Sequence, residues 1–324
     1  MKEAHQSRRS PRKWAVCLLA SMTLNLGFLP VRVDARLLEE VINVPVTVTN
    51  FYGKEVSQDI VVTVFVEDAT PSPRPLLVIG HGRKSGEADR VKMGRRRYSA
   101  TSSWFAQLGF LVAVPTRIGY GVSGGEDVEY SGSCSSRQYP PACRAAAAQT
   151  LRVLDTLRQR RDAVKDRAVI VGQSFGGAAA ITAAALNPPG VQAVINFAGG
   201  GGGNPEDRPQ SPCSPELLER MFATCGKSSR VPTLWMYAEN DRYWGPAYPR
   251  EWFEAFVKSG GVGEFVMYPP HGKDGHSLFV AGPEVWRPRV LEFLRANGYP
   301  ELREPPAAAP RPKQAALLAP ETAQ

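Results

Sequence analysis

The segment from Ala168 to Gly177 constrains the fold of this chain more than any other part of the sequence. An apolar run, Ala168-Val-Ile-Val171, leads into Gly172-Gln-Ser-Phe-Gly176 and then into small residues typical of a helix. A serine on such a tight strand-to-helix turn is held in a strained backbone conformation, and Gly172 and Gly176 give the turn room. We therefore expect a nucleophile elbow with Ser174 at its tip. A glycine-rich turn without chemistry is the alternative.

Apolar runs and helix-like segments alternate along the rest of the chain. Two strands rich in Val and Thr come first with no helix between them, which indicates an antiparallel edge. Later strands alternate with helices, which predicts an α/β fold with a mostly parallel eight-stranded sheet and helices on both faces. The expected strands are Val41–Thr49, Asp59–Glu67, Leu76–Ile79, Phe110–Val114, Ala168–Val171, Val191–Phe197, Thr233–Tyr237 and Phe265–Tyr268. The expected helices are Thr101–Leu108, Cys143–Arg160, Ser174–Leu186, a short one at Glu216–Phe222, Pro246–Ser259 and Val285–Asn297.

A serine nucleophile needs a base, and the base needs an acid to orient it. His271 and His276 both follow the last expected strand, and His276 is preferred because it lies further into the loop, after a glycine. Glu239 and Asp241 follow the preceding strand, and Asp241 is favoured by its place in the turn. The expected triad is therefore Ser174, Asp241 and His276, in that chain order.

Acyl transfer also needs two donors for the oxyanion. One is expected to be the backbone N–H of Phe175, which follows the nucleophile. The second is expected from the loop Gly80-His-Gly-Arg83, from the N–H of Arg83 or of Gly82. His81 is then a structural residue that braces this loop.

Together these motifs resemble the α/β-hydrolase superfamily, and within it the dienelactone hydrolase-like and acyl-peptidase-like branch. The resemblance implies an α/β-hydrolase fold and an acyl-enzyme mechanism that needs no metal and no organic cofactor. Dienelactone hydrolases proper use a cysteine nucleophile, so the serine here favours ordinary carboxylic ester hydrolysis of a small-molecule substrate. The residues that carry the resemblance are His81-Gly82, Arg117–Ser123, Gly172–Gly177, Ala238–Asp241 and Asp274–His276.

Two other functions are compatible with these residues. One is a serine peptidase resembling the catalytic domain of prolyl oligopeptidase, although the chain has no room for the propeller that usually restricts access in that family. The other is a catalytically inactive binding protein on the same fold, because a fold does not by itself imply activity. Loss of a triad residue would favour the inactive protein, and none is missing.

The N-terminus is typical of an export signal. A basic stretch with Arg8, Arg9, Arg12 and Lys13 precedes an apolar one, and Val33-Asp-Ala35 predicts cleavage after Ala35. An uncleaved anchor is the alternative, and a twin-arginine signal is weakly indicated. The expected organisation is a signal peptide at 1–35, a catalytic domain at 36–300 and a disordered Pro- and Ala-rich tail at 301–324, with no membrane span after cleavage and a periplasmic or secreted location.

Cysteines and charge agree with export. Four cysteines remain after cleavage, and an even number in an oxidising compartment predicts disulfides. Local pairing, Cys134–Cys143 and Cys213–Cys225, is expected, because each pair closes a short loop, and no histidine at ligand spacing points to a metal. Residues 1–35 hold six basic and two acidic side chains, so the net charge falls from +8 to about +4, which gives no argument for nucleic acid.

Overall fold

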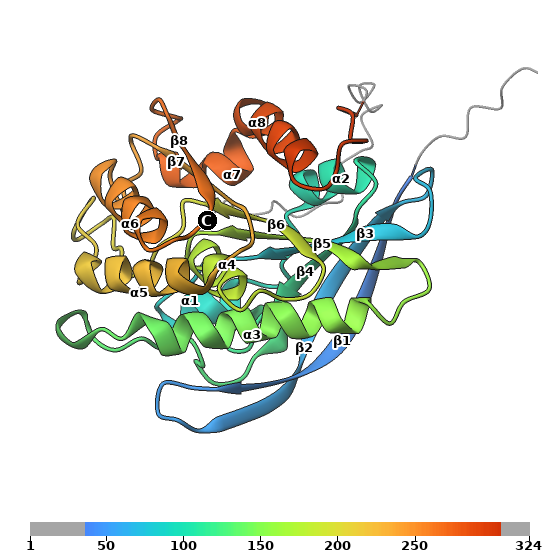
Figure 1. Ribbon diagram of the computed structural model, residues 1–324. Coiled ribbons are helices and arrows are strands. Elements are labelled where there is room, and N and C mark those ends of the chain that lie inside the picture. Colours follow the sequence, from blue (N-terminus) through green and yellow to red (C-terminus); the bar gives the residue numbers. More distant parts are fainter. Residues whose placement is uncertain (1–35, 306–324) are drawn as a thin grey trace, which may run out of the picture. The chain divides into compact units, whose positions relative to one another are not determined.

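The computed structural model describes residues 36–305. The expected signal peptide and residues 306–324 of the expected tail lie outside this part. One sheet of eight strands forms the centre of the described part, in the order β1-β2-β4-β3-β5-β6-β7-β8 (Figure 1). The strands are β1 (Leu37–Thr49), β2 (Glu55–Glu67), β3 (Arg74–Gly80), β4 (Leu111–Thr116), β5 (Ala163–Gln173), β6 (Val191–Phe197), β7 (Thr233–Ala238) and β8 (Gly263–Tyr268).

Pairing in the sheet follows the expected pattern. β1 pairs antiparallel with β2, and β2 antiparallel with β4. From β4 to β8 every pairing is parallel. Parallel strands place their carboxyl ends along one edge, where loops that carry functional residues meet.

Helices cover both faces of the sheet, and alternating strand residues separate two cores. In β3, Leu76 and Val78 pack against the helices of one face, while Leu77 and Ile79 pack against those of the other. The first face is covered by α3 (Tyr139–Leu157), α4 (Phe175–Ala184), α5 (Pro215–Ser228) and α6 (Ala247–Lys258). The second is covered by α2 (Ser99–Gln107), α7 (Leu278–Ala281) and α8 (Pro283–Ala296), and the short α1 (Glu87–Lys92) lies beside the loop after β4. The chain has the α/β-hydrolase fold.

Two helices are longer at an end than expected. α3 begins at Tyr139, with Pro140 and Pro141 in its first turn, and α5 runs from Pro215 to Ser228. Prolines fit the first turn of a helix because the N–H groups there have no partner within the helix. These prolines therefore lie at the starts of helices.

These helices explain why both predicted disulfides are wrong. The structure pairs Cys134 with Cys213, 79 residues apart, with their Cα atoms 5.1 Å from each other. Cys143 lies in α3 and Cys225 in α5, and both are buried free thiols. The local pairs were predicted because each would close a short loop in a segment expected to lack regular structure. The bond instead joins the loop before α3 to the loop before α5.

No helix within residues 36–305 is long and apolar enough to cross a membrane.

Candidate active site

Four loops bring the predicted site residues to the same edge of the sheet. Ser174 directly follows β5, and His81 to Arg83 follow β3. Asp241 follows β7 after two residues, and His276 lies in the loop after β8. These are the carboxyl ends of parallel strands, so residues far apart in the sequence converge there.

The turn at Ser174 has the strained geometry expected of a nucleophile elbow. Its φ and ψ are 57° and −125°, outside the regions that side-chain-bearing residues prefer. A Cβ at Gly172 would lie 2.0 Å from the carbonyl oxygen of Gly176, and a Cβ at Gly176 would lie 2.4 Å from that of Gly80. Only glycine lets the turn close this tightly, and the Ser174 N–H is held by the carbonyl of Phe197 at 2.9 Å.

A continuous row of hydrogen bonds joins Ser174, His276 and Asp241. The Ser174 hydroxyl lies 2.9 Å from Nε2 of His276, and Nδ1 of His276 lies 2.9 Å from Oδ2 of Asp241. Asp241 is fully buried, and its Oδ1 accepts from the N–H groups of Tyr243 at 2.8 Å and Trp244 at 3.2 Å. These three hydrogen bonds fix the position of the buried carboxylate beside the imidazole.

The orientation of the imidazole is set from several sides. The N–H of His276 donates to Oδ1 of Asp274 at 3.0 Å, and the ring of Tyr243 stacks on the imidazole with centroids 3.9 Å apart. Tyr243 was not singled out in the sequence, although its place two residues after Asp241 is the signal that could have found it. The alternative acid and base are not part of this row. Glu239 is exposed, and His271 contacts Asn240, to whose Oδ1 its backbone N–H donates.

The loop after β3 lies directly against the serine. A Cβ at Gly82 would come 3.1 Å from Cβ of Ser174, so glycine lets this loop approach. Within residues 36–305, the backbone N–H groups of Phe175, Gly82 and Arg83 have no acceptor. An N–H at the start of a helix lacks a partner within the helix, so that of Phe175 is free to meet a developing negative charge.

His81, Arg117 and Glu129 hold this loop in place, and we call these three residues the loop brace. Nδ1 of His81 donates to the carbonyl of Gly82 at 2.6 Å, and Nε2 accepts the backbone N–H of Arg117 at 3.1 Å. The Arg117 guanidinium donates to the His81 carbonyl at 2.7 Å and pairs with Glu129, and both charged side chains are buried. Burial and the nearby cations of Arg117 and Arg96 hold the pKa of His81 well below its usual value. His81 is therefore a neutral structural residue.

Arg83 itself is held by its side chain. Its guanidinium makes two hydrogen bonds of 2.6 Å to the carboxylate of Asp127 and a third of 3.2 Å to the hydroxyl of Tyr120. The sequence did not single out Asp127 or Glu129 as partners, because a pairing across many residues leaves no local pattern. Both carboxylates come from the Gly- and Ser-rich loop after β4, and they fix the position of the backbone at Arg83.

No cluster of three or more His, Cys, Asp or Glu side chains in the described part of the chain is arranged to hold a metal ion.

Comparisons with known proteins agree with this fold. The chain matches the solved structures of the esterase Pf2001 of Pyrococcus furiosus, an acetyl xylan esterase of Paenibacillus sp. R4 and an acylaminoacyl peptidase of Pyrococcus horikoshii. TM-scores are 0.52, 0.53 and 0.54 at 13%, 16% and 12% identity, so they show the shared fold. The matches cover 80%, 81% and 84% of this chain and 90%, 89% and 43% of those chains. No curated protein sequence shows significant similarity to the chain. The profile of the Dienelactone hydrolase family matches residues 92–285, most of the chain, and the chain belongs to this family of hydrolases.

Proposed function

We propose that this hydrolase is a serine esterase that cleaves small carboxylic esters through an acyl-enzyme. The observation that carries the proposal is the hydrogen-bonded row from Ser174 through His276 to buried Asp241, with the serine on a strained turn. A hydroxyl, an imidazole and a carboxylate in this order form the arrangement that activates a serine for attack on a carbonyl.

In the proposed mechanism, Nε2 of His276 takes the proton of the Ser174 hydroxyl as the oxygen attacks the ester carbonyl. Asp241 accepts the Nδ1 proton in a hydrogen bond and stabilises the imidazolium that forms. The tetrahedral intermediate collapses when His276 gives the proton to the leaving alcohol. Water then attacks the acyl-enzyme by the same route and releases the carboxylic acid.

The free N–H groups beside the serine would meet the oxyanion. Phe175 and Arg83, with Gly82 as the alternative to Arg83, are the proposed donors. The loop brace and the Arg83–Asp127 pair keep the second donor in position before substrate arrives. Donors that need no rearrangement stabilise the transition state most strongly.

Labelling with a fluorophosphonate tests the proposal. The purified protein, Ser174→Ala and the matched control Ser85→Ala, which replaces an exposed serine, are incubated with the probe and with nitrophenyl esters of increasing chain length. We expect labelling and turnover in the wild type and in the control, and neither in Ser174→Ala. A folded wild-type protein that neither labels nor hydrolyses any ester would favour the inactive binding protein.

We also propose that the protein is exported. The support is the basic and apolar N-terminal pattern together with the Cys134–Cys213 disulfide, a bond that persists mainly in oxidising compartments. N-terminal sequencing of the protein from fractionated cells of its source checks this. A mature chain that begins at Arg36 in the periplasm or medium is expected, and an intact Met1 in the cytoplasm would contradict it.

A further inference from the structure

A cavity lies away from the Ser174 row, between α3, α4 and α5. These helices pack against one another on one face of the sheet (Figure 1). The cavity has a volume of about 630 Å³, within the range of sites that hold small molecules. None of Ser174, Asp241 and His276 lines it.

The walls of the cavity are largely apolar. Tyr139 comes from α3, Leu186 from the end of α4, and Leu217 and Met221 from α5. Leu186 is 61% exposed, so its aliphatic side chain is accessible to a ligand in this cavity. Apolar walls of this kind favour a hydrocarbon ligand.

The charged residues that line the cavity are all positive. They are Arg137, Arg144 and Arg220, and no aspartate or glutamate lines it. In the described part of the chain none of the three forms an ion pair, whereas Arg83, Arg95, Arg97 and Arg117 all do. The Nε of Arg137 is buried without an acceptor, while its terminal nitrogens donate to the Ser131 hydroxyl at 3.0 Å and to Sγ of Cys213 at 3.8 Å. Three unneutralised guanidinium groups around one cavity favour an anion.

We infer that this cavity binds a medium-chain alkanoate, with its carboxylate on the arginines and its single chain against the apolar walls. A neutral lipid would leave the three arginines without an anion, and an inorganic anion would leave the apolar walls in contact with water. The site is independent of the proposed chemistry at Ser174, although the ligand belongs to the class of acids that ester hydrolysis releases.

Calorimetric titration of the full chain with dodecanoate tests the inference, with dodecanol and acetate as comparison ligands. The protein is first blocked with a fluorophosphonate or carries Ser174→Ala, so that the row at Ser174 cannot account for binding. We expect saturable binding of dodecanoate at one site per chain, and much weaker binding of dodecanol and of acetate. Absence of saturable binding to the wild type, or binding that vanishes when Ser174 is blocked, would overturn the inference.

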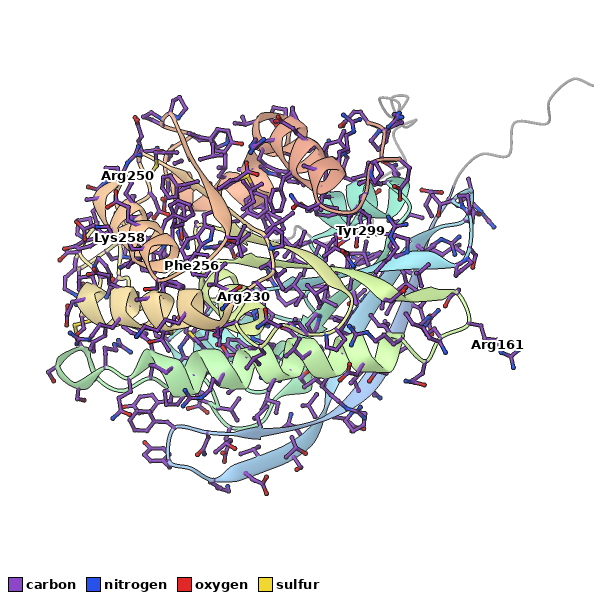
Figure 2. The ribbon with its side chains drawn as sticks, in the orientation of Figure 1. Arg161, Arg230, Arg250, Phe256, Lys258 and Tyr299 are labelled. Carbon is purple, nitrogen blue, oxygen red and sulfur yellow. A yellow bond between two sulfur atoms is a disulfide. The ribbon has the colours of Figure 1, made fainter. Side chains whose placement is uncertain are left out.

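Variants locate the ligand. Arg144→Gln and Arg220→Gln should each weaken binding about tenfold, since each removes a charge-assisted hydrogen bond, and both side chains are exposed and safe to change. Leu186→Asp, also at an exposed position, should weaken it further by placing an anion beside the arginines. Arg161→Gln is the matched control, because Arg161 projects from the loop beyond the other end of α3 (Figure 2). Equal affinity in all four variants would place the ligand elsewhere.

Discussion

Two groups of buried polar residues flank Ser174, and they differ in whether a histidine nitrogen is left free to bind the serine hydroxyl. On one side, the His276–Asp241 pair keeps one imidazole nitrogen for the serine hydroxyl. On the other side, in the loop brace, both ring nitrogens of His81 form hydrogen bonds with backbone groups. The charges of Arg117 and Glu129 neutralise each other in a buried ion pair. Both histidines lie beside the same serine turn. The difference teaches that a buried histidine is a candidate base only where its structural hydrogen bonds leave one ring nitrogen free for the nucleophile.

The comparison predicts that substitutions in the Ser174–His276–Asp241 row abolish ester hydrolysis, whereas substitutions in the loop brace mainly lower the stability of the fold. The largest effect should follow Ser174→Ala, which removes the nucleophile. We expect ester turnover to fall by roughly 10⁴- to 10⁶-fold with little change in the thermal midpoint. Steady-state kinetics and a thermal melt measure both, and a variant that keeps more than a tenth of wild-type turnover would contradict the assignment.

Asp241→Asn should come next. The amide cannot stabilise the imidazolium and can select the wrong tautomer, so kcat should fall by about 10⁴-fold while the fold is retained. Glu239→Gln is the matched control on the same loop, and its exposed side chain should change kcat less than twofold. If the two variants lost activity equally, the acid would not be Asp241.

The disulfide joins the segment that follows the brace to the loop before α5, so its loss should act on stability. A cross-link that closes 79 residues constrains the unfolded chain, and Cys134→Ser should lower the free energy of unfolding by about 4 kcal/mol. Chemical denaturation measures this. Cys143→Ser is the matched comparison, because Cys143 is a buried free thiol and its replacement breaks no cross-link. Equal sensitivity of both variants to a reductant would contradict the pairing.

Glu129→Gln breaks the brace by leaving the Arg117 cation buried without its carboxylate. Removing one partner of a buried ion pair costs about 3 kcal/mol or more, so the urea midpoint should fall clearly. The molecules that remain folded should lose much less kcat than Asp241→Asn, since Glu129 does not contact the Ser174 row and acts only through the position of the second oxyanion donor. A loss of kcat as large as that of Asp241→Asn would assign the brace a role in the chemistry.

The smallest expected effect is a pH dependence of stability that comes from His81. Its pKa is held well below the usual value in the folded chain, while the unfolded chain binds a proton near pH 6.5. Because the unfolded state then binds more protons, stability falls as the pH drops from about 6.5, by up to about 1.4 kcal/mol per pH unit.

Denaturation curves of the wild type and His81→Gln between pH 7 and pH 5 measure this dependence. In this window the carboxyl groups with lowered pKa values, such as Glu39 and Asp162, remain ionised even in the unfolded chain. The variant should lose most of the slope. Parallel pH profiles would show that His81 is not the group responsible.

The sequence by itself determined the order of strands and helices and the place of the nucleophile turn. These depend on interactions between near neighbours, such as the apolar run of β5 and the collision that a side chain at Gly172 would cause. The antiparallel start and the parallel remainder follow in the same way, because a helix between two strands dictates a crossover. The residues of the hydrogen-bonded row could be expected for a related reason, since each lies in a segment that follows a strand ending at the same edge of the sheet.

Only the tertiary structure decided which distant groups meet. The sequence left His271 open beside His276 and gave no sign of the Arg117–Glu129 pair, and it pointed to the wrong cysteine partners. Cys134 and Cys213 are joined because α3 and α5 pack side by side, a contact that no local pattern encodes. The arginines around the cavity between α3, α4 and α5, which form no ion pair in the described part of the chain, belong here too, since the ion pairs of an arginine depend on what the fold places within a few ångströms of it. Local sequence preferences specify the strands and helices, and the packing between these elements specifies which distant side chains form ion pairs, hydrogen bonds and the disulfide.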